Sequence, residues 1–273
     1  MELRDAVIIL TGASRGIGVH IAEDLARAGA HLVLAARSRD KLEAVAEKVR
    51  AAGGQATVVP TDVSRAADRA ALLAAAEAVG PVAALINNAG IELPIAVVDL
   101  EAEEVERILA VNLLGAIELT RITVKAMIPR GRGSVVMVSS MSGKSPTPYN
   151  AIYTASKFGL NGFTASLRLE LEGTGVSCGT VCPGFVAGAG MWSDSETAAP
   201  ALLPPVPLER VVRGVRRVLN GAGEVLVMPI PVRPLLALGQ LFPSIDGLVL
   251  RWLGVLGIFR ERAAELAAER AQR

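Results

Sequence analysis

Thr11-Gly12-Ala13-Ser14-Arg15-Gly16-Ile17-Gly18 is the stretch of this sequence that decides the expected fold. It follows a short apolar run, Ala6 to Leu10, typical of a buried parallel strand, and precedes a helical pattern that runs through Ala28 to a closing Gly29. Glycines in such a turn let the backbone approach a pyrophosphate closely, and the helix N-terminus supplies unpaired N–H groups and a positive dipole end. Because the spacing is G-x-x-x-G-x-G rather than the standard G-x-G-x-x-G, the turn alone could also be a packing device.

The rest of the chain continues the alternation of strands and helices. Further strands are expected over His31 to Ala36, Ala56 to Pro60, Val82 to Ile86, Ser134 to Val138, Val176 to Val181 and Glu224 to Met228. Helices are expected over Asp40 to Ala52, from a capping Ser64 to Val79, Glu101 to Ile128, from Tyr149 to about Glu172, and Leu208 to Leu219. This alternation predicts right-handed βαβ units, and hence an α/β fold with a doubly wound, mostly parallel seven-stranded sheet in a single domain.

Composition narrows the classes of protein to which the chain can belong. Its 273 residues are 51% hydrophobic and 20% charged, which suits one large α/β domain with an ample core. A formal net charge of +1 and 3% aromatic residues give no support for a nucleic-acid surface. Two Cys and two His are too few for a convincing structural metal site, and Cys178 and Cys182 are expected to be reduced core thiols. Glu2, Arg4 and Asp5 precede only a short apolar run, so no secretory signal is expected and the predicted compartment is cytoplasmic.

Tyr153 and Lys157 form the candidate for the chemistry, because on a helix their side chains share one face, one turn apart. A phenol loses its proton near pH ~10, and a neighbouring ammonium lowers that pKa. Lowering it by roughly three units takes about 4 kcal/mol, which Lys157 and a bound cationic ring could supply together. The phenol would then exchange a proton with a carbonyl oxygen or an alcohol near neutral pH. An isolated Tyr-x-x-x-Lys is a weak pattern, and an amphipathic helix with a solvated Lys is the alternative.

Several separate motifs occur in the order found in short-chain dehydrogenases/reductases (SDRs) of the Tyr-x-x-x-Lys type, and residues 5 to 230 resemble that family. Besides the glycine turn, they are Asn87-Asn88-Ala89-Gly90 after the fourth strand, Asn112 on the long helix, Ser139-Ser140 at the end of the fifth strand and Pro183-Gly184 after the sixth. Ser140 precedes Tyr153 by thirteen residues, which is the family spacing. These motifs lie at the carboxyl ends of expected strands or on helices facing them, where open α/β sheets bind ligands.

The resemblance implies a Rossmann-type domain over residues 1–230 and assigns roles to four catalytic residues. Tyr153 would be the general acid in reduction and the general base in oxidation, while Lys157 would lower its pKa and hold the nicotinamide ribose. Ser140 would donate to the substrate oxygen and stabilise its developing charge. Asn112 would kink its helix and hold a water in a proton relay to Lys157. The alternatives are a Ser140 that merely closes a strand end and an Asn112 at the surface of its helix.

The implied cofactor contacts cover the glycine turn, several strand ends and the catalytic pair. They are Gly12, Ser14, Arg15, Gly16, Ile17, Gly18, Arg37, Asp62, Val63, Asn88, Ala89, Gly90, Tyr153, Lys157, Pro183, Gly184 and Val186. Asp62 would accept a hydrogen bond from the adenine amine, or else cap the helix that follows. Two residues beyond Val186 the family usually carries a Thr that touches the nicotinamide carboxamide, but this sequence has Gly188. The backbone of Val186 would then hold the amide, in a looser clamp or under a mobile lid.

The end of the second strand predicts which cofactor is used. A carboxylate there would bind the ribose 2′-OH of NAD(H) and repel a 2′-phosphate, but this sequence has Ala36 and then Arg37. Arg39 follows, and Arg15 of the glycine turn lies close to the same place in such folds. Two guanidiniums and no acid predict a bidentate phosphate site and hence NADP(H). The alternative is that Arg37 and Arg39 are solvated loop charges.

Two segments depart from a minimal domain of this kind. Residues 188–207 are expected to form the substrate loop, lined by Met191, Trp192, Leu202 and Leu203. Residues 231–273 are expected to form an apolar, helical C-terminal extension, without a stretch of ~18 uncharged apolar residues that could span a bilayer. The extension could cover the substrate cleft, form a subunit interface, or contact a membrane surface through residues 231–260. The first two are favoured because residues 261–273 mix both signs of charge.

The sequence therefore predicts an NADP(H)-dependent oxidoreductase that interconverts a ketone or aldehyde and an alcohol on a hydrophobic substrate, which could be lipid-, steroid- or acyl-like. A catalytically silent NADP(H)-binding regulatory or scaffold protein is the alternative, because a fold does not fix a function. The resemblance also implies a homodimer or homotetramer that pairs through the long helix and the helix of Tyr153.

Overall fold

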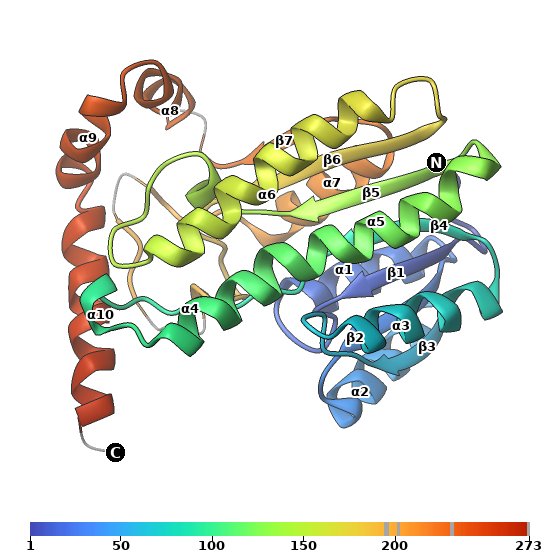
Figure 1. Ribbon diagram of the computed structural model, residues 1–273. Coiled ribbons are helices and arrows are strands. Elements are labelled where there is room, and N and C mark those ends of the chain that lie inside the picture. The colour runs from blue at the N-terminus through green and yellow to red at the C-terminus, as the bar shows by residue number, and fades with distance from the viewer. Residues whose placement is uncertain (194–196, 201–202, 230–231, 272–273) are drawn as a thin grey trace.

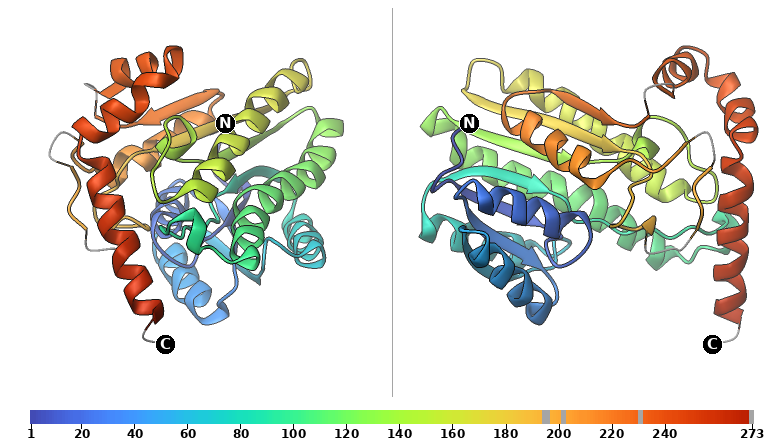
Figure 2. Two further views of the ribbon diagram at one scale, coloured as in Figure 1. Left: turned by 60° about the vertical axis from the view of Figure 1, so that its left-hand side comes forward. Right: turned by 180° about the vertical axis from the view of Figure 1, so that it is seen from behind.

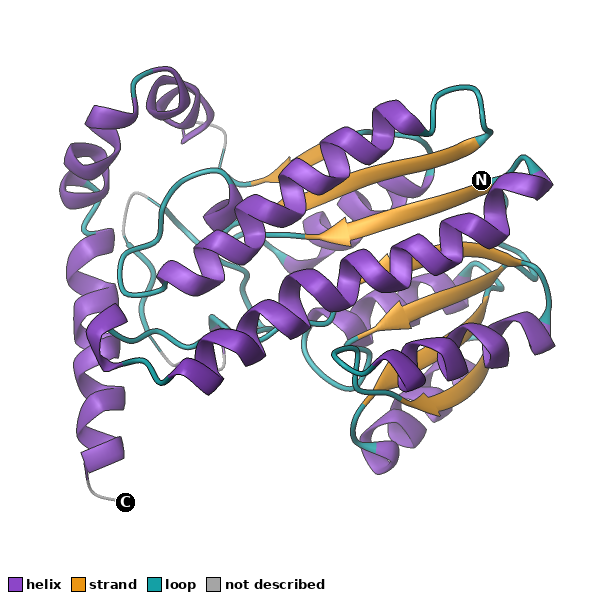
Figure 3. Cartoon of the chain, in the orientation of Figure 1, coloured by secondary structure: helices purple, strands orange, loops and turns teal. Residues whose placement is uncertain are grey.

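A parallel seven-stranded sheet in the order β3-β2-β1-β4-β5-β6-β7 forms the centre of the computed structural model, which describes residues 1–193, 197–200, 203–229 and 232–271. Helices cover both faces of the sheet (Figures 1 and 3). The strands are β1 (Val7–Thr11), β2 (His31–Ala36), β3 (Gln55–Pro60), β4 (Val82–Asn87), β5 (Gly133–Val138), β6 (Val176–Pro183) and β7 (Glu224–Val227). The strand order reverses between β1 and β4, which is where doubly wound sheets bind their ligands. The expected fold class is thereby confirmed.

The helices fill the connections between strands and extend beyond the last of them. They are α1 (Ile17–Arg27), α2 (Arg39–Ala51), α3 (Ala66–Val79), α4 (Ala102–Leu109), α5 (Gly115–Met127), α6 (Ala151–Glu170), α7 (Leu208–Leu219), α8 (Val232–Leu241), α9 (Asp246–Trp252) and α10 (Val255–Ala271). Short 3₁₀ turns are η1 (Val97–Asp99), η3 (Ile128–Arg130), η4 (Met141–Gly143) and η6 (Pro243–Ile245). The helical character expected of the C-terminal extension is therefore present in α8, α9 and α10.

Alternate side chains of the central strand enter two different cores. Ile8 and Leu10 of β1 pack with α1, α2 and α7 on one face, while Val7 and Ile9 pack with α3, α5 and α6 on the other. This division follows from the two-residue period of a strand, which turns successive side chains to opposite faces of the sheet. A strand buried on both faces must be apolar throughout, as the run before the glycine turn is.

The long helix expected over residues 101–128 is interrupted rather than continuous. It consists of α4, one π-helical turn over Ala110–Leu114 (η2) and α5. A π turn holds one more residue than an α turn and occurs frequently at functional sites. Asn112, predicted to kink this helix, lies within the π turn and is 1% exposed, so the alternative that it is a surface residue is wrong.

The helix cap expected at Ser64 is also wrong. The third helix begins at Ala66, with Arg65 as its N-cap residue. The Ser64 backbone N–H and hydroxyl both donate to Asp62 Oδ1, over 3.0 and 2.6 Å. Because this Asx-type turn already uses the Ser64 hydroxyl as a donor, Asp62 organises the loop and Ser64 does not cap the helix.

The C-terminal extension lies at the end of the molecule toward which the carboxyl ends of the strands point (Figures 1 and 2). Helix α10 is tied to α4 by an ion pair between Arg270 and Glu104, whose N and O atoms are 2.5 Å apart. None of the helices among the described residues combines the length and the apolar character needed to cross a membrane. Leu202 and residues 194–196 of the expected substrate loop lie outside the described residues.

Candidate active site

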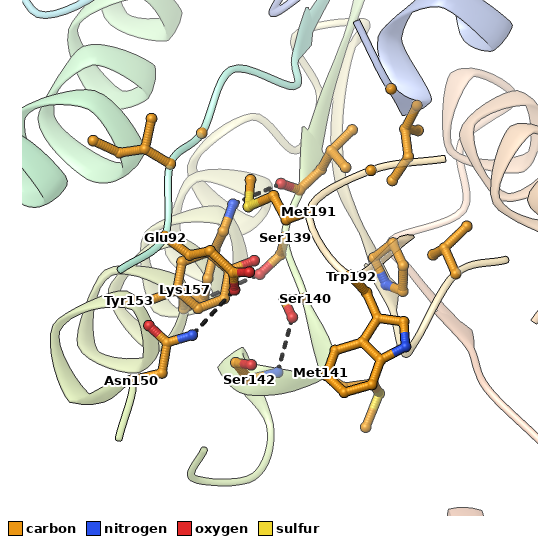
Figure 4. A pocket seen from close by; sticks show the side chains of 18 of the residues that line it. Glu92, Ser139, Ser140, Met141, Ser142, Asn150, Tyr153, Lys157, Met191 and Trp192 are labelled. Carbon is orange, nitrogen blue, oxygen red and sulfur yellow. Dashed lines mark hydrogen bonds between the residues drawn. The ribbon is translucent and has the colours of Figure 1, made fainter. Parts of the chain in front are cut away.

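A cavity of about 950 Å³ opens at the carboxyl ends of the strands. Of the described residues predicted to contact cofactor or substrate, Gly18, Arg39 and Asn112 are not part of its lining, and the others line it. Figure 4 shows Ser140, Tyr153 and Lys157 directed into one region of the cavity, with Glu92 and Asn150 beside the tyrosine. The structure therefore brings together side chains from the segment after β5, from α6 and its N-cap, and from the loop after β4.

The glycine turn and the loop after β4 are fastened to each other. Thr11 Oγ accepts hydrogen bonds from the backbone N–H groups of Asn88 (3.0 Å) and Ala89 (3.1 Å). The Asn88 side-chain amide donates in return to the carbonyls of Thr11 (3.1 Å) and Gly12 (3.0 Å). Gly12 has φ 63°, and a Cβ there would lie 2.8 Å from Ala89 Cα. Only glycine can occupy this position. Because it has no side chain, space remains in the cavity for a phosphate group at the start of α1.

Gly18 holds α1 close to the turn instead of facing the cavity. A Cβ on Gly18 would collide with the Gly12 carbonyl oxygen and would lie 2.9 Å from Asn88 Nδ2. We expect Gly18→Ala to lower the free energy of unfolding by about 1–3 kcal/mol, because the helix must move away from the turn. Urea unfolding measures this change.

Gly162→Ala is the matched control, because Gly162 is exposed on α6 and its added Cβ would meet nothing within 4 Å. It is expected to raise the free energy of unfolding by about 0.5–1 kcal/mol, the usual gain when Gly becomes Ala in a helix. Equal unfolding free energies for wild type and Gly18→Ala would show that the close approach of α1 to the turn is not required.

Basic and acidic side chains meet at the end of β2. Arg37 lines the cavity, together with Arg15 and with Lys41 of α2. The positive charge of Arg37 contributes to a lowered pKa of Asp62, although burial acts the other way and hydrogen bonds from Ser64 lower it more. Arg39 instead forms an ion pair with Glu43 one turn along α2, at 3.6 Å. The alternative of a solvated surface charge therefore describes Arg39, while Arg37 is placed to meet an anion.

Ser140 and Tyr153 face each other at the catalytic end of the cavity. Ser140 is the N-cap residue of η4, and its Oγ accepts a hydrogen bond from the Ser142 N–H at 3.1 Å. Because this bond uses a lone pair, the hydroxyl hydrogen of Ser140 can still be donated. Tyr153 is 8% exposed and shares a hydrogen bond with Ser140. Two hydroxyl groups thus converge where a carbonyl oxygen could accept from both.

The pKa of Tyr153 is raised above its ordinary value by the protein's own groups, whereas the sequence predicted that Lys157 and a bound cationic ring together would lower it. Burial is the largest cause, and the Glu92 carboxylate adds to it, while the hydrogen bond with Ser140 acts in the opposite direction. Lys157 is itself buried, which lowers its pKa to about 8. Its Nζ donates to the Val138 carbonyl at 3.0 Å and lies 5.5 Å from the centre of the Tyr153 ring. Loss of hydration outweighs the attraction of the ammonium here.

Asn112 uses its side-chain amide to hold the loop that follows β4. Its Oδ1 accepts from the Ile91 N–H, and its Nδ2 donates to the Ile91 carbonyl, both at 2.8 Å. Nδ2 also lies 3.1 Å from Ser156 Oγ, one residue from Lys157. The amide therefore positions the backbone beside Gly90, and its part in a water relay stays a prediction.

The residues after β6 shape the wall opposite Tyr153. Val186 forms an isolated parallel bridge with Val206, through hydrogen bonds from Ala187 N to Val206 O (3.0 Å) and from Val206 N to Phe185 O (2.7 Å). In such a bridge the backbone N–H and C=O of Val186 point away from Val206. The predicted contact of the Val186 backbone with the nicotinamide amide requires this direction. Gly188 has φ 75°, a left-handed conformation that a β-branched residue rarely adopts. A Thr would therefore be strained at this position.

Apolar residues close the far end of the cavity, and many of them belong to the extension. Leu253, Val255 and Phe259 form a cluster with side chains that include Phe185, Trp192 and Leu203. The centres of the Trp192 and Phe185 rings are 4.2 Å apart. These contacts are those expected if the extension covers the substrate cleft. Several large side chains of α8 and α9 remain exposed, so an interface or a membrane contact stays open for that face: Leu238, Leu241, Leu248 and Trp252.

Sequence reasoning missed the charge of Glu92 beside Tyr153 and the pairing of Glu92 with Arg262. Glu92 lies two positions after the Asn-Ala-Gly loop, and this proximity to a motif was the only local signal. Its partner Arg262, on α10, is 170 positions away and belongs to no motif. Lys41 and Asn150 also line the cavity without having been predicted.

The sequence of this chain is similar to a known protein family and to ketoacyl reductases of two bacteria. A model of the short chain dehydrogenase family matches residues 6–199. The ketoacyl reductase HetN of Nostoc sp. is 39% identical over 271 residues, a match that covers 96% of this chain and 93% of that protein. A putative ketoacyl reductase of Streptomyces coelicolor is 39% identical over 183 residues, covering 66% of this chain and 70% of the other. The Nostoc match is long enough to take in most of the extension.

Two solved structures with the same architecture contain nicotinamide cofactors. A metagenomic short-chain oxidoreductase in complex with NADP is 34% identical, with a TM-score of 0.72, and the match covers 83% of this chain and 98% of that one. The actinorhodin polyketide ketoreductase with NADPH is 29% identical, with a TM-score of 0.74, and the match covers 82% of this chain and 95% of that one.

Proposed function

The chain belongs to the short chain dehydrogenase family, and on that premise we propose that it is an NADP(H)-dependent oxidoreductase acting on a hydrophobic carbonyl or alcohol substrate. The observation that carries the proposal is the meeting of Ser140, Tyr153 and Lys157 in the cavity into which the glycine turn opens. A merely structural Tyr or Lys would not need to be buried beside a ligand-sized cavity.

The residues present fit NADP(H). At Gly12 the backbone can lie close to a pyrophosphate because there is no side chain, and α1 begins a few residues later. Arg37, with Arg15 and Lys41 in the same part of the cavity, would hold the 2′-phosphate, and Asp62 would accept from the adenine amine. When bound, the cofactor supplies or accepts a hydride at its nicotinamide ring.

Tyr153 would hand a proton to the substrate oxygen in reduction, and Ser140 would donate a second hydrogen bond to it. The raised pKa keeps the phenol in its protonated form at neutral pH, the form from which a proton can be donated, and it also makes the phenol a weaker acid than a free tyrosine. Lys157, with a pKa of about 8, carries its charge near neutral pH and would hold the nicotinamide ribose and return a proton to Tyr153. In oxidation the same phenol would act as the base.

The apolar far end of the cavity supports a substrate with a hydrophobic chain or ring system. Trp192, Leu253 and Phe259 line this end and pack in one cluster of apolar side chains. The Nostoc and Streptomyces relatives are ketoacyl reductases by name, and a 3-oxoacyl group has the required combination of a ketone and an apolar chain. Steroid- and lipid-like ketones also combine a ketone with a large apolar group.

A ketone panel with increasing chain length tests the proposed function. We expect NADPH oxidation, with kcat/KM rising about fourfold for each added methylene until the cavity is filled, because burying one methylene contributes about 0.8 kcal/mol. NADPH binding is titrated separately. Tight binding without turnover over the whole panel would contradict the proposal and favour a silent regulatory or scaffold protein.

Two further properties are proposed on family grounds. Leu114 and Phe158 are large apolar side chains that remain exposed on the π turn and on α6, and this exposure supports pairing of two copies through the long helix and the helix of Tyr153. We propose a homodimer or homotetramer, in which residues 1–230 form the catalytic domain and residues 231–273 its cover.

A further inference from the structure

A buried ion pair connects the C-terminal extension to the wall of the cavity. Arg262 of α10 donates through Nη2 to Glu92 Oε1 at 3.1 Å, and the two side chains are only 10% and 15% exposed. The other Glu92 oxygen, Oε2, accepts from Asn150 Nδ2 at 3.1 Å, as the dashed line in Figure 4 shows. Glu92 and Asn150 both line the cavity next to Tyr153. The extension thus contributes a charge to the surroundings of the reacting group.

This network is poorly explained by stability alone. Two charges removed from water recover little net free energy, so a buried pair is a weak stabiliser. Moreover, Asn150 Oδ1 and Arg262 Nη1 are buried without a hydrogen-bond partner among the described residues. Incompletely satisfied buried polar groups are uncommon, and each one calls for an explanation such as a catalytic role.

The guanidinium of Arg262 also holds aromatic rings of the cavity. It lies 5.1 Å from the centre of the Trp192 ring and 5.4 Å from that of Phe259. Trp192 belongs to the expected substrate loop and packs on Phe185, which follows the Pro183-Gly184 motif. One side chain therefore contacts the loop after β4, the substrate loop and its own helix.

We propose that Arg262 is a positioning residue for the reaction at Tyr153, because it fixes the Glu92 carboxylate beside the tyrosine and the Trp192 ring on the substrate loop, and because it partly neutralises the carboxylate. The inference rests on the proposed function. It assigns to the extension an electrostatic part in catalysis besides its part as a cover.

The effect of the Glu92–Arg262 ion pair depends on the titratable and hydrogen-bonding groups that surround Tyr153. Glu92 faces it from the loop after β4, Lys157 from α6 and Cys182 from β6, while Ser140 hydrogen-bonds to it. Glu92 raises the pKa of the phenol. Because the ion pair places the positive charge of Arg262 on the same carboxylate, we expect the guanidinium to offset part of this effect. Loss of Arg262 should therefore raise the pKa of Tyr153 further, and loss of the Glu92 charge should lower it.

Arg262→Met tests the inference through the pH profile of alcohol oxidation, in which Tyr153 acts as the base. We expect the midpoint of the kcat profile to move upward by about one pH unit, which is a tenfold loss of rate at a fixed pH below the midpoint. Arg270→Met is the matched control, because Arg270 ties the same helix to Glu104 without lining the cavity. It should leave the midpoint in place. A downward shift, no shift, or equal shifts in the two variants would overturn the proposal.

Glu92→Gln gives a second arm that preserves packing. Its midpoint should move downward by about one pH unit, and adding Arg262→Met to it should produce no further shift, because the guanidinium acts through the carboxylate. Independent effects of the two substitutions would contradict the assignment. Arg262→Lys, which keeps the charge, should retain the wild-type midpoint.

Fluorescence supplies a readout that does not depend on turnover. The chain has two Trp residues, and Trp252 is exposed, so Trp252→Phe leaves the emission of Trp192 alone. In that background Arg262→Met should change the Trp192 emission and Arg270→Met should not; unchanged emission in both would contradict the contact with Trp192. Absence of wild-type turnover would refute the proposed function, whereas wild-type turnover with unshifted profiles would refute only the role of Arg262.

Discussion

Tyr153→Phe should reduce kcat for carbonyl reduction by about 10²–10⁴-fold, the contribution typical of a positioned general acid. The substitution removes one hydroxyl from a buried site and keeps the ring, so the cavity retains its shape. Ser140 keeps the hydrogen bond from Ser142 and can still donate to a substrate oxygen. NADPH affinity should therefore change little, and the loss should be seen in kcat in single-turnover and steady-state measurements alike.

Tyr149→Phe is the matched control, because it makes the same change four residues upstream. The Tyr149 hydroxyl accepts a hydrogen bond from Arg260 Nε at 3.2 Å in an exposed position. Its loss should leave kcat close to that of wild type, as for most surface substitutions. Equal rates for wild type and Tyr153→Phe would end the proposed acid role.

Arg37→Asp should reverse the preference for cofactor. The substitution removes a charge-assisted hydrogen bond to the 2′-phosphate, worth about 1.5–3 kcal/mol, and adds a repulsive carboxylate. The same carboxylate can accept from the ribose 2′-OH of NADH. We expect the ratio of kcat/KM for NADPH to that for NADH to fall by about 10²-fold or more, measured with one ketone at a fixed concentration.

Arg39→Asp controls for the general effect of removing positive charge from this end of the sheet. Because Arg39 pairs with Glu43 on the exposed face of α2, its replacement should leave the cofactor ratio near that of wild type. If Arg37→Asp also left the ratio unchanged, the 2′-phosphate would have to be held by other residues, for which Arg15 and Lys41 are the first choice.

The fold was predictable because local signals and global arrangement agree in this chain. The second strand begins at His31 and ends at Ala36, as its apolar run predicted, and the other strands differ from expectation by one or two residues at their ends. Apolar runs bounded by Gly, Pro and Asn specify buried parallel strands strongly. Most of the predicted site residues line one cavity because each follows a strand of the same sheet edge.

Features that depend on tertiary contacts were not predictable. No periodicity distinguishes the π turn over Ala110–Leu114 from the α-helices on either side of it. The pairing of Glu92 with Arg262 joins segments that no motif links. The direction of the Tyr153 pKa was missed because it depends on burial and on Glu92, whereas spacing along a helix reveals only the neighbouring lysine.

The position of β1 at the centre of the sheet bears on how the chain folds. Val7 pairs with His31 on β2 but also with Val82 on β4, so β1 can complete its hydrogen bonding on one side only after two intervening βα units have been assembled. Parallel pairing across such separations carries a large loop-closure entropy and makes folding slow. Until β4 has formed, the edge of an apolar strand is open to pairing with other chains, which exposes the protein to aggregation during its synthesis.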